Sequence, residues 1–329
     1  MVAPFSISGG RRAWLSSLLA CVALACGRGG SEEAAAAPLT IRIGLDMWPG
    51  YYPLLFAEVD PQLRADGVSL ELFMPEDTDA MLLAFTTGAC DGVAVALGDL
   101  ITLAQGEADA GVILVSDESA GGDAVVGRGA FAGSESLRGA RVGTNLGGFG
   151  ELFVRELLGR HGVSPAQLSL MHVEAAEVPA RLADGTIDAG HTWEPYVSEA
   201  LGGGAQLWFS SAQTPGLIPD VLALRGEFIA KHPREIEALC AAWFRGVERW
   251  RSDPAGGAAL IGARLGVSAQ SISLEGIKIL DRAANLSLMD PAAPSSLHAV
   301  AERYIDFFIE RGMLRSRPSP SRLLRGSYL

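Results

Sequence analysis

The chain has 329 residues, of which 49% are hydrophobic and 19% charged, a composition typical of a globular protein long enough to form two lobes. Its 26 basic and 38 acidic residues give a net charge of −12 at pH 7. A negative surface offers few cations to phosphate groups, so we expect no nucleic-acid partner and no polybasic contact with a membrane.

The N-terminal 25 residues have the pattern of an export signal peptide. Two arginines at 11–12 precede an apolar run over residues 13–25, which is too short to span a bilayer as a helix. Small residues before Cys26 are similar to a bacterial lipobox, which predicts cleavage there and lipidation of Cys26. The alternative is ordinary cleavage nearby, because Ala23 stands where a larger aliphatic residue is usual. Residues 26–38 are predicted to form a flexible tether.

Two further cysteines, Cys90 and Cys240, lie far apart in the chain. The first is predicted at a turn between a helix and a strand, and the second inside a helix. We expect both to be unpaired small hydrophobic residues rather than partners in a disulfide.

The stretch over residues 39–58 organises the rest of the chain. Apolar residues alternate over 39–45 and predict a strand, and a proline suited to the first turn of a helix follows. Between them, Trp48, Tyr51 and Tyr52 bring three rings to the loop at the carboxyl end of the strand. Open α/β sheets bind ligands at such loops. The alternative for any single ring is a cap over the hydrophobic core.

After this stretch, strands and helices alternate, which predicts parallel pairing in an α/β protein. Further strands are predicted at 68–73, 93–97, 112–115, 123–126, 140–143, 169–173, 186–193, 206–209 and 220–224. Crossings between two lobes are predicted at 117–123 and 210–220. The first lobe then comprises residues 39–119 and 220–329, and the second lobe residues 120–219.

The C-terminal part of the chain is predicted to be helical from Pro233 onward. Apolar residues at three- and four-residue spacing between Ile236 and Trp250 form one face, which is more often a packed core than a binding site. Further helices are predicted over 258–265, 273–284 and 298–312.

A short sequence pattern, which we call the internal echo, occurs once in each lobe. Residues 83–91 and 181–188 each combine a helix end, a glycine, two further residues and an aspartate before a strand. Asp99 and Tyr196 each lie eight residues beyond their aspartate. Both lobes are therefore predicted to place a strand-end loop at a matching position, facing a site between them.

Three stretches resemble the periplasmic substrate-binding proteins of ABC importers, in the group for nitrate, sulfonate, bicarbonate and thiamine pyrimidines. They are I-R-I-G-L-D-M-W-P-G-Y-Y-P-L-L-F-A-E at 41–58, D-E-S-A-G-G-D-A-V-V-G-R at 117–128 with S-L-R-G-A-R-V-G-T at 136–144, and L-A-D-G-T-I-D-A-G-H-T-W-E-P-Y at 182–196. The resemblance implies a type II-like periplasmic-binding-protein fold of two lobes, each a mainly parallel sheet flanked by helices, that close like a hinge.

The resemblance also implies where the protein works and with what. We expect an exported periplasmic monomer, held at the membrane only by its N-terminal lipid, that binds a small-molecule solute. Its expected partners are a permease and an ATPase in the inner membrane. No metal and no cofactor are expected.

Ligand contacts carried over from the family, residue by residue, fall on Trp48, Tyr51, Asp99, Ser119, Asp123, Gly148, Phe149, Gly150 and Glu194. Backbone N–H groups at 148–150 would suit an anion at a helix start. Glu151 would repel that anion, or would simply be a first-turn acid favoured by the helix dipole.

Three of these residues, Asp99, Asp123 and Glu194, are candidate acceptors for an N–H or ammonium group of the ligand. Trp48 and Tyr51 can stack on a heteroaromatic ring or enclose a cation. The alternatives are a helix N-cap for Asp99, a hinge cap for Asp123 and a surface position for Glu194. Acids and rings together favour an amine-bearing or heterocyclic, pyrimidine-like ligand.

Other functions stay open at this point. One is binding of a small anion such as sulfonate or nitrate, and another is a sensory protein that presents its ligand to a receptor. We do not expect an enzyme, because the sequence has no Gly-x-Ser-x-Gly elbow and no Walker loop. A related pyrimidine synthase joins a pyridoxal cofactor to a lysine, but the lysines here, Lys231 and Lys278, are both late and predicted to be helical.

Overall fold

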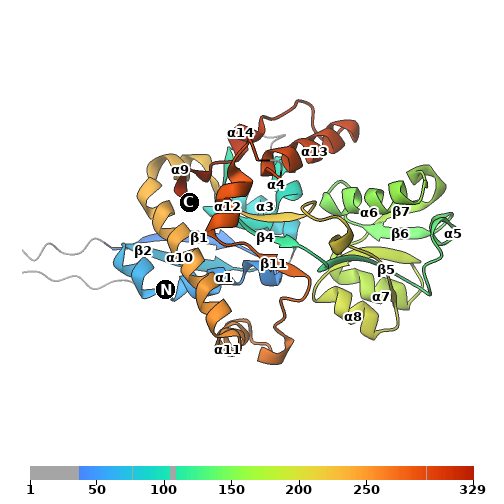
Figure 1. Ribbon diagram of the computed structural model, residues 1–329, viewed down its shortest axis with the longest axis horizontal. Helices are drawn as coiled ribbons and strands as arrows, with labels where there is room; N and C mark the ends of the chain where they lie inside the picture. The colour runs from blue at the N-terminus through green and yellow to red at the C-terminus, as the bar shows by residue number, and fades with distance from the viewer. Residues whose placement is uncertain (1–36, 76, 104–108, 294) are drawn as a thin grey trace, which may run out of the picture. The chain divides into compact units, whose positions relative to one another are not determined.

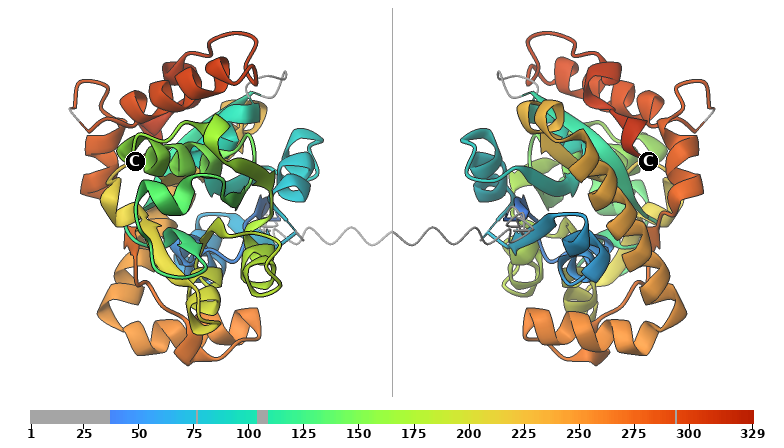
Figure 2. Two further views of the ribbon diagram at one scale, coloured as in Figure 1. Left: turned by 90° about the vertical axis from the view of Figure 1, so that its right-hand side faces the viewer. Right: turned by 90° about the vertical axis from the view of Figure 1, so that its left-hand side faces the viewer.

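The computed structural model describes residues 37–75, 77–103, 109–293 and 295–329, which contain two β-sheets and the helices around them (Figures 1 and 2). The predicted signal peptide, the lipidation site Cys26 and tether residues 26–36 lie outside the described residues. A search of the described helices finds none with the length and apolar character that a bilayer span requires.

The first sheet has six strands in the order β11-β4-β10-β3-β1-β2. These are β1 (Leu39–Gly44), β2 (Val68–Phe73), β3 (Gly92–Ala96), β4 (Ala110–Ser119), β10 (Pro219–Arg225) and β11 (Ile277–Ile279). The predicted parallel pairing holds for β2-β1-β3, whereas β10 runs antiparallel to both β3 and β4. The direction of β10 follows from topology, because β4 leads to the second sheet and β10 returns beside it.

The second sheet has five strands in the order β7-β6-β8-β5-β9. They are β5 (Asp123–Gly127), β6 (Arg141–Thr144), β7 (Ser169–His172), β8 (Ala189–Trp193) and β9 (Gln206–Ser210). Its parallel part, β7-β6-β8, repeats the arrangement of β2-β1-β3, and β5 is antiparallel to β8 and β9. The chain passes between the sheets after Ser119 and again before Pro219.

The α-helices are α1 (Pro53–Glu58), α2 (Pro61–Ala65), α3 (Thr78–Thr86), α4 (Leu97–Thr102), α5 (Ser134–Leu137), α6 (Phe149–Arg160), α7 (Val178–Ala183), α8 (Tyr196–Gly202), α9 (Gly226–Lys231), α10 (Pro233–Ser252), α11 (Pro254–Leu265), α12 (Arg282–Met289), α13 (Leu297–Glu310) and α14 (Pro320–Leu323). Local sequence signals mark the start of several of them. Pro53 occupies the first turn of α1, and the carboxylate of Asp77 caps α3 by accepting from Ala80 N at 2.7 Å.

The first sheet buries both of its faces. On β10, Leu222 and Leu224 pack into a core that includes α1 and α10, whereas the alternate residues Val221 and Ala223 pack into a core shared with α4 and α13. This alternation follows from the period of two along a strand. The aromatic stripe of α10 belongs to the first of these cores, as predicted, with Trp243 fully buried.

One segment differs from its prediction. Residues 273–284 were expected to be helical, but Ile277–Ile279 form the edge strand β11 along β4, and a helix begins only at Arg282. The carbonyl of Gly276 accepts backbone hydrogen bonds from Ala120 and Gly122, so the segment satisfies an open sheet edge. Lys278 therefore lies on a strand, where its ammonium contacts Glu118 at 2.9 Å.

The internal echo corresponds to the same helix end and the same backbone hydrogen bond in both sheets. Gly88 and Gly185, with φ of 77° and 75°, follow α3 and α7 and supply the left-handed backbone that ends each helix. Asp91 and Asp188 each accept a hydrogen bond at 2.9 Å from a backbone N–H in the first parallel strand of their sheet, β1 or β6. The echo thus stabilises two similar halves rather than forming a site by itself.

Both cysteines of the folded part are free and buried, which confirms the prediction for Cys90 and Cys240. Burial raises the pKa of the Cys240 thiol to about 12. This thiol is therefore protonated at neutral pH and a poor nucleophile.

Candidate ligand-binding site

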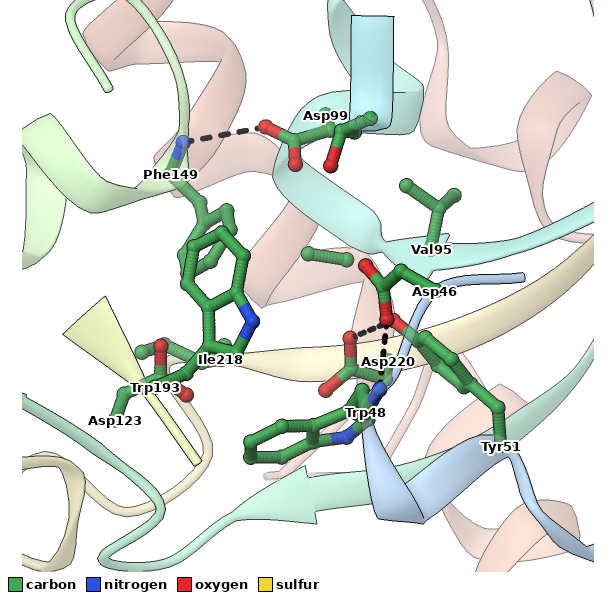
Figure 3. A pocket seen from close by; sticks show the side chains of 12 residues that line it. Asp46, Trp48, Tyr51, Val95, Asp99, Asp123, Phe149, Trp193, Ile218 and Asp220 are labelled. Atoms are coloured by element: carbon green, nitrogen blue, oxygen red, sulfur yellow. Dashed lines mark hydrogen bonds between the residues drawn. The ribbon is translucent and has the colours of Figure 1, made fainter. Parts of the chain in front are cut away.

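A narrow pocket lies where loops from both sheets meet (Figure 3). Its walls are Asp46, Trp48, Tyr51, Thr78, Val95, Ala96, Asp99, Asp123, Phe149, Trp193, Ile218 and Asp220. Most of them lie at or beyond the carboxyl ends of parallel strands, the position where open α/β sheets bind ligands.

The loop after β1 supplies two rings of the pocket and fixes both to the strands that connect the sheets. The indole N–H of Trp48 donates to Asp117 Oδ1 at 2.9 Å, and the Tyr51 hydroxyl donates to Asp220 Oδ1 at 2.6 Å. The backbone N–H of Trp48 also donates to Asp46 at 2.9 Å and tightens the turn. Both rings are therefore preorganised, with their exposed edges turned to the pocket.

Two carboxylates face one another beneath this loop. Asp117 on β4 and Asp220 on β10 are directly paired in the antiparallel register, and their exposed fractions are 0% and 4%. Burial raises the pKa of both carboxyls, and the charge of Asp117 raises that of Asp220 further. Two negative charges on neighbouring buried carboxyls repel one another, so the pair favours a state in which one of the two carboxyls keeps its proton.

Two further carboxylates, both in the wall of the pocket, have raised pKa values for the same main reason. Burial raises the pKa of Asp46 to about 6 and that of Asp99 to about 7. Within the described residues, no lysine or arginine lines this pocket, although four carboxylates do. The wall therefore presents hydrogen-bond acceptors, together with carboxyl groups that become negative when they lose a proton.

Carboxylates of the protein itself accept from backbone N–H groups of the glycine-rich loop before α6. Gly147 N donates to Glu151 Oε2 at 3.0 Å, and Phe149 N lies 3.5 Å from Asp99 Oδ1. Glu151 is fully buried, with Arg155 and Arg311 as partners. The donors at the start of α6 are thus taken by acids, which leaves little for an anionic ligand.

On the side of the second sheet, Asp123 at the start of β5 is held by His191, whose Nε2 lies 3.0 Å from Asp123 Oδ1. Both side chains are buried. The His191 ring meets Phe149 edge to face, with centroids 5.5 Å apart, and Phe149 in turn lies 5.8 Å from Trp193. This side of the pocket is chiefly aromatic.

The model of the NMT1-like family matches residues 34–263, more than half of the chain. The chain belongs to the NMT1-like family. Among curated proteins, it is 25% identical over 163 residues to a protein of Brucella abortus that is named only as a binding protein. That match covers 48% of this chain, and the chain spans about half the length of the relative.

Solved structures share the fold of this NMT1-like protein across 88% of its length. The ligand-binding component of an ABC-type import system from Staphylococcus aureus, solved with zinc bound, is 15% identical with a TM-score of 0.72 over 97% of its chain. The periplasmic aliphatic sulphonate-binding protein SsuA from Escherichia coli is 18% identical with a TM-score of 0.71 over 99% of its chain. The desulfurization enzyme DszB, 16% identical over 97% of its chain with a TM-score of 0.62, has the same fold. The two-lobed α/β fold expected from the sequence is therefore confirmed.

Five of the nine predicted contact residues lie in the wall of the pocket in this NMT1-like protein: Trp48, Tyr51, Asp99, Asp123 and Phe149. The structure brings them together from loops of both sheets. Their contact with a ligand stays a prediction.

The other predicted residues lie outside the wall. The hydroxyl of Ser119 lies 2.8 Å from that of Ser211 and accepts from Asp123 N at 3.0 Å, so it organises the crossing between the sheets. The carboxylate of Glu194 instead accepts from the backbone N–H and hydroxyl of Ser198 at 3.1 and 3.0 Å and caps α8.

Gly148 and Gly150 lie behind the wall, and their lack of a side chain permits close packing. A Cβ at Gly148 would lie 3.1 Å from Asp99 Oδ1, and one at Gly150 would lie 2.5 Å from the His191 ring. The two glycines allow α6 to approach its neighbours, which positions Phe149.

Sequence reasoning did not single out seven wall residues: Asp46, Thr78, Val95, Ala96, Trp193, Ile218 and Asp220. Asp46 lies two residues beyond β1 and Trp193 is the last residue of β8, so position at a strand end was a usable signal for both. No sequence signal reveals that Asp220 faces Asp117, because this depends on the register of strands about a hundred residues apart.

Proposed function

We propose that this NMT1-like protein is an extracytoplasmic solute-binding protein that captures a small amine-bearing or heterocyclic organic molecule. One observation carries the proposal: four carboxylates and four aromatic rings line the pocket, whereas no lysine or arginine among the described residues does. A cationic or N–H-rich ligand would supply the missing counter-charge, and the rings would stack on it or enclose it.

Capture occurs by closure of two lobes about the crossings between the sheets. The first lobe comprises residues 39–119 and 220–329 and the second lobe residues 120–219. Two crossing segments suit a hinge, and the pocket wall draws on both sheets. Closure therefore removes the ligand from water and strengthens its ion pairs with the wall.

The solute is delivered to an ABC importer with its own permease and ATPase, and the binding protein acts as a monomer. The similarity of fold to an import-system component supports this role. Lipidation of Cys26 would hold the protein near its permease on the outer side of the inner membrane, with residues 26–38 as the tether.

Binding without chemistry is the favoured activity. Neither Lys231 nor Lys278 lines the pocket, so the site offers no amine for a Schiff base, and the buried thiols of Cys90 and Cys240 lie elsewhere. Because DszB has the same fold and is an enzyme, conversion of the bound molecule has to be tested directly.

The deciding experiment identifies the ligand that the purified protein retains. Mass spectrometry of small molecules released on denaturation should show a compound with an amine or a nitrogen heterocycle. Calorimetry with benzylamine, choline and 4-aminopyrimidine, against methanesulfonate and nitrate, then measures which class saturates the site. Saturable binding of the anions with no response to the amines or the pyrimidine would overturn the proposed ligand class. A product formed from the bound compound would overturn the assignment as a binding protein.

A further inference from the structure

Away from the pocket, the end of α13 contacts the start of α6, and these helices pack on different sheets. The contact centres on Glu151, a carboxylate with an exposed fraction of 0%. Its Oε1 accepts from Arg311 Nε at 2.8 Å, just beyond the end of α13. Its Oε2 accepts from Gly147 N at 3.0 Å, in the glycine-rich loop that leads to Phe149. One buried carboxylate therefore joins α13 to a loop of the pocket.

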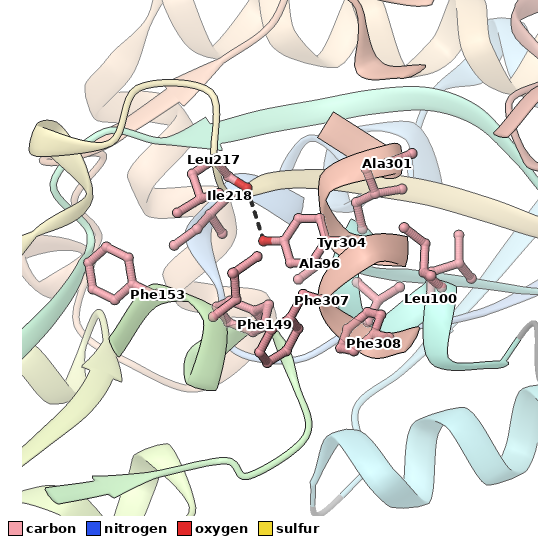
Figure 4. Close-up of a cluster of buried hydrophobic side chains, with 14 of the residues drawn as sticks. Ala96, Leu100, Phe149, Phe153, Leu217, Ile218, Ala301, Tyr304, Phe307 and Phe308 are labelled. Carbon is pink, nitrogen blue, oxygen red and sulfur yellow. Dashed lines mark hydrogen bonds between the residues drawn. The ribbon is translucent and has the colours of Figure 1, made fainter. Parts of the chain in front are cut away.

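A second ion pair and apolar contacts extend this contact. Arg303 on α13 pairs with Glu156 on α6, and the guanidinium of Arg155 lies over the Phe307 ring at 5.4 Å from its centroid. Figure 4 shows rings of the two helices in one hydrophobic cluster. A Cβ at Gly98 on α4 would overlap both Tyr304 and Phe149, so three elements meet there closely.

The helix α13 is fixed to the part of the molecule built on the first sheet. The segment after it returns to β4, where Leu324 bridges to Val112 and Arg325 N donates to the Val112 carbonyl at 2.9 Å. The Tyr304 hydroxyl also donates to the carbonyl of Leu217 at 2.9 Å, beside the returning crossing. Movement of the two sheets apart would therefore separate Arg311 from Glu151.

Glu151 has a partner that would stay with it after such a separation. Arg155, one turn further along α6, donates to Oε1 at 3.0 Å. A buried carboxylate that lost its only partner would oppose opening strongly, whereas one with a partner on its own helix can exchange Arg311 for water. The contact is thus suited to forming and breaking repeatedly.

We propose that the Arg311–Glu151 pair, supported by Arg303–Glu156, is an ionic latch that holds the two lobes closed and positions Phe149 against the ligand. The latch rests on the hinge closure of the proposed function. Arg311 and Glu151 are positioning residues, since neither lines the pocket. The latch keeps the ligand from leaving and is weakened by salt, which screens the half-exposed Arg311 and Arg303 more than the buried carboxylate.

The test measures the distance between the lobes directly. Spin labels at Leu83→Cys on α3 and Leu201→Cys on α8, both exposed positions, report this distance without involving the buried native cysteines. Arg311→Gln should shift the ligand-free protein toward longer distances. It should also speed the dissociation of a bound amine about tenfold, below the loss expected for a fully buried ion pair because Arg311 is half-exposed. Added salt should reproduce the shift in the unmodified protein and have a smaller effect in the variant, which retains only the Arg303–Glu156 pair.

The matched control is Arg141→Gln, which removes an arginine of similar exposure that pairs with Asp188 within the second sheet. It should leave the distance distribution unchanged. Equal distributions in the two variants, or a lower melting temperature of Arg311→Gln with no change in distance, would overturn the latch. Arg303→Gln provides a second variant should Arg311→Gln fold poorly. If no amine binds the unmodified protein, the proposed ligand class fails, but the distance measurement still decides the latch.

Discussion

The loops after β1 and β6 hold equivalent positions in two sheets of similar parallel arrangement, yet they have opposite chemistry. The first presents Asp46, Trp48 and Tyr51 to the pocket. The side chains of Trp48 and Tyr51 donate hydrogen bonds to the strands that connect the sheets. The second is rich in glycine and leads to α6, where Glu151 and Asp99 accept from its backbone donors.

This difference assigns different tasks to the two sides of the pocket. A helix start with free N–H groups attracts anions, but here carboxylates of the protein take that place. Under the proposed function, recognition of charge falls mainly to the acids on the side of the first sheet, Asp46, Asp99 and Asp220, while Phe149 and Trp193 line the other side beside Asp123.

The largest effect is expected from Asp220→Asn. The amide still accepts from the Tyr51 hydroxyl, but position 220 can no longer ionise when a cation binds beside the Asp117–Asp220 pair, so affinity for a cationic amine should fall roughly 100-fold. Calorimetry measures the loss. Asp188→Asn, a carboxylate outside the pocket, is the control and should leave affinity unchanged. An unaltered affinity in Asp220→Asn would show that Asp220, on the side of the first sheet, does not recognise the charge of the ligand.

The next effect is on stability as a function of pH. The folded protein holds protons on Asp46 and Asp99 up to about pH 6 and 7, above the usual value of 3.8, so it binds more protons than the unfolded chain. This stabilisation is complete below the usual pKa and is lost as pH rises through the raised values. The ligand-free protein should therefore lose about 2 to 3 kcal/mol between pH 5 and pH 8 through Asp99 alone, at about 1.4 kcal/mol per pH unit.

Urea unfolding at the two pH values measures this loss, and Asp99→Asn should flatten the dependence. Choline, whose charge does not titrate, should bind more tightly at pH 8 than at pH 5, because its carboxylate partners are then ionised. Stability that rises from pH 5 to pH 8 in the ligand-free protein would contradict the raised pKa values.

A smaller effect is expected from Asp99→Asn on ligand choice. The amide oxygen still accepts from Phe149 N, but repulsion at the start of α6 weakens, so affinity for amines should fall about tenfold and methanesulfonate should begin to bind. Asp79→Asn, an exposed first-turn acid of α3, is the matched control. Competition calorimetry compares the two variants. If methanesulfonate remains unbound and amine affinity is unchanged, Asp99 does not set the preference.

The smallest effect concerns the aromatic side. Trp193→Leu should weaken binding of 4-aminopyrimidine severalfold, because stacking on one ring contributes about 1 kcal/mol beyond the area that it buries. Trp193→Phe should restore most of the affinity. Fluorescence titration distinguishes the two, and equal losses in both variants would indicate a shape requirement instead of stacking.

Much of the local structure could be predicted because its causes lie within a few residues. The alternation over 39–45 predicts β1, Asp77 predicts the start of α3, and the glycines of the echo predict two helix ends. The aromatic loop after β1 was found for the same reason, since its rings follow a strand directly. Residues 273–284 were mistaken for a helix because the signal for β11 is the open edge of β4, which local sequence does not contain.

The sequence by itself determined most strand and helix positions, the α/β class and the ring-bearing loop, because hydrophobic period and turn chemistry act over short range. Only the tertiary structure decided that Asp117 and Asp220 face one another, that Glu194 caps α8 instead of lining the pocket, and that Glu151 reaches Arg311. Each of these contacts depends on strand register or on packing around a neighbouring turn. Chain segments more than a hundred residues apart meet in two of them, so no local pattern records the outcome.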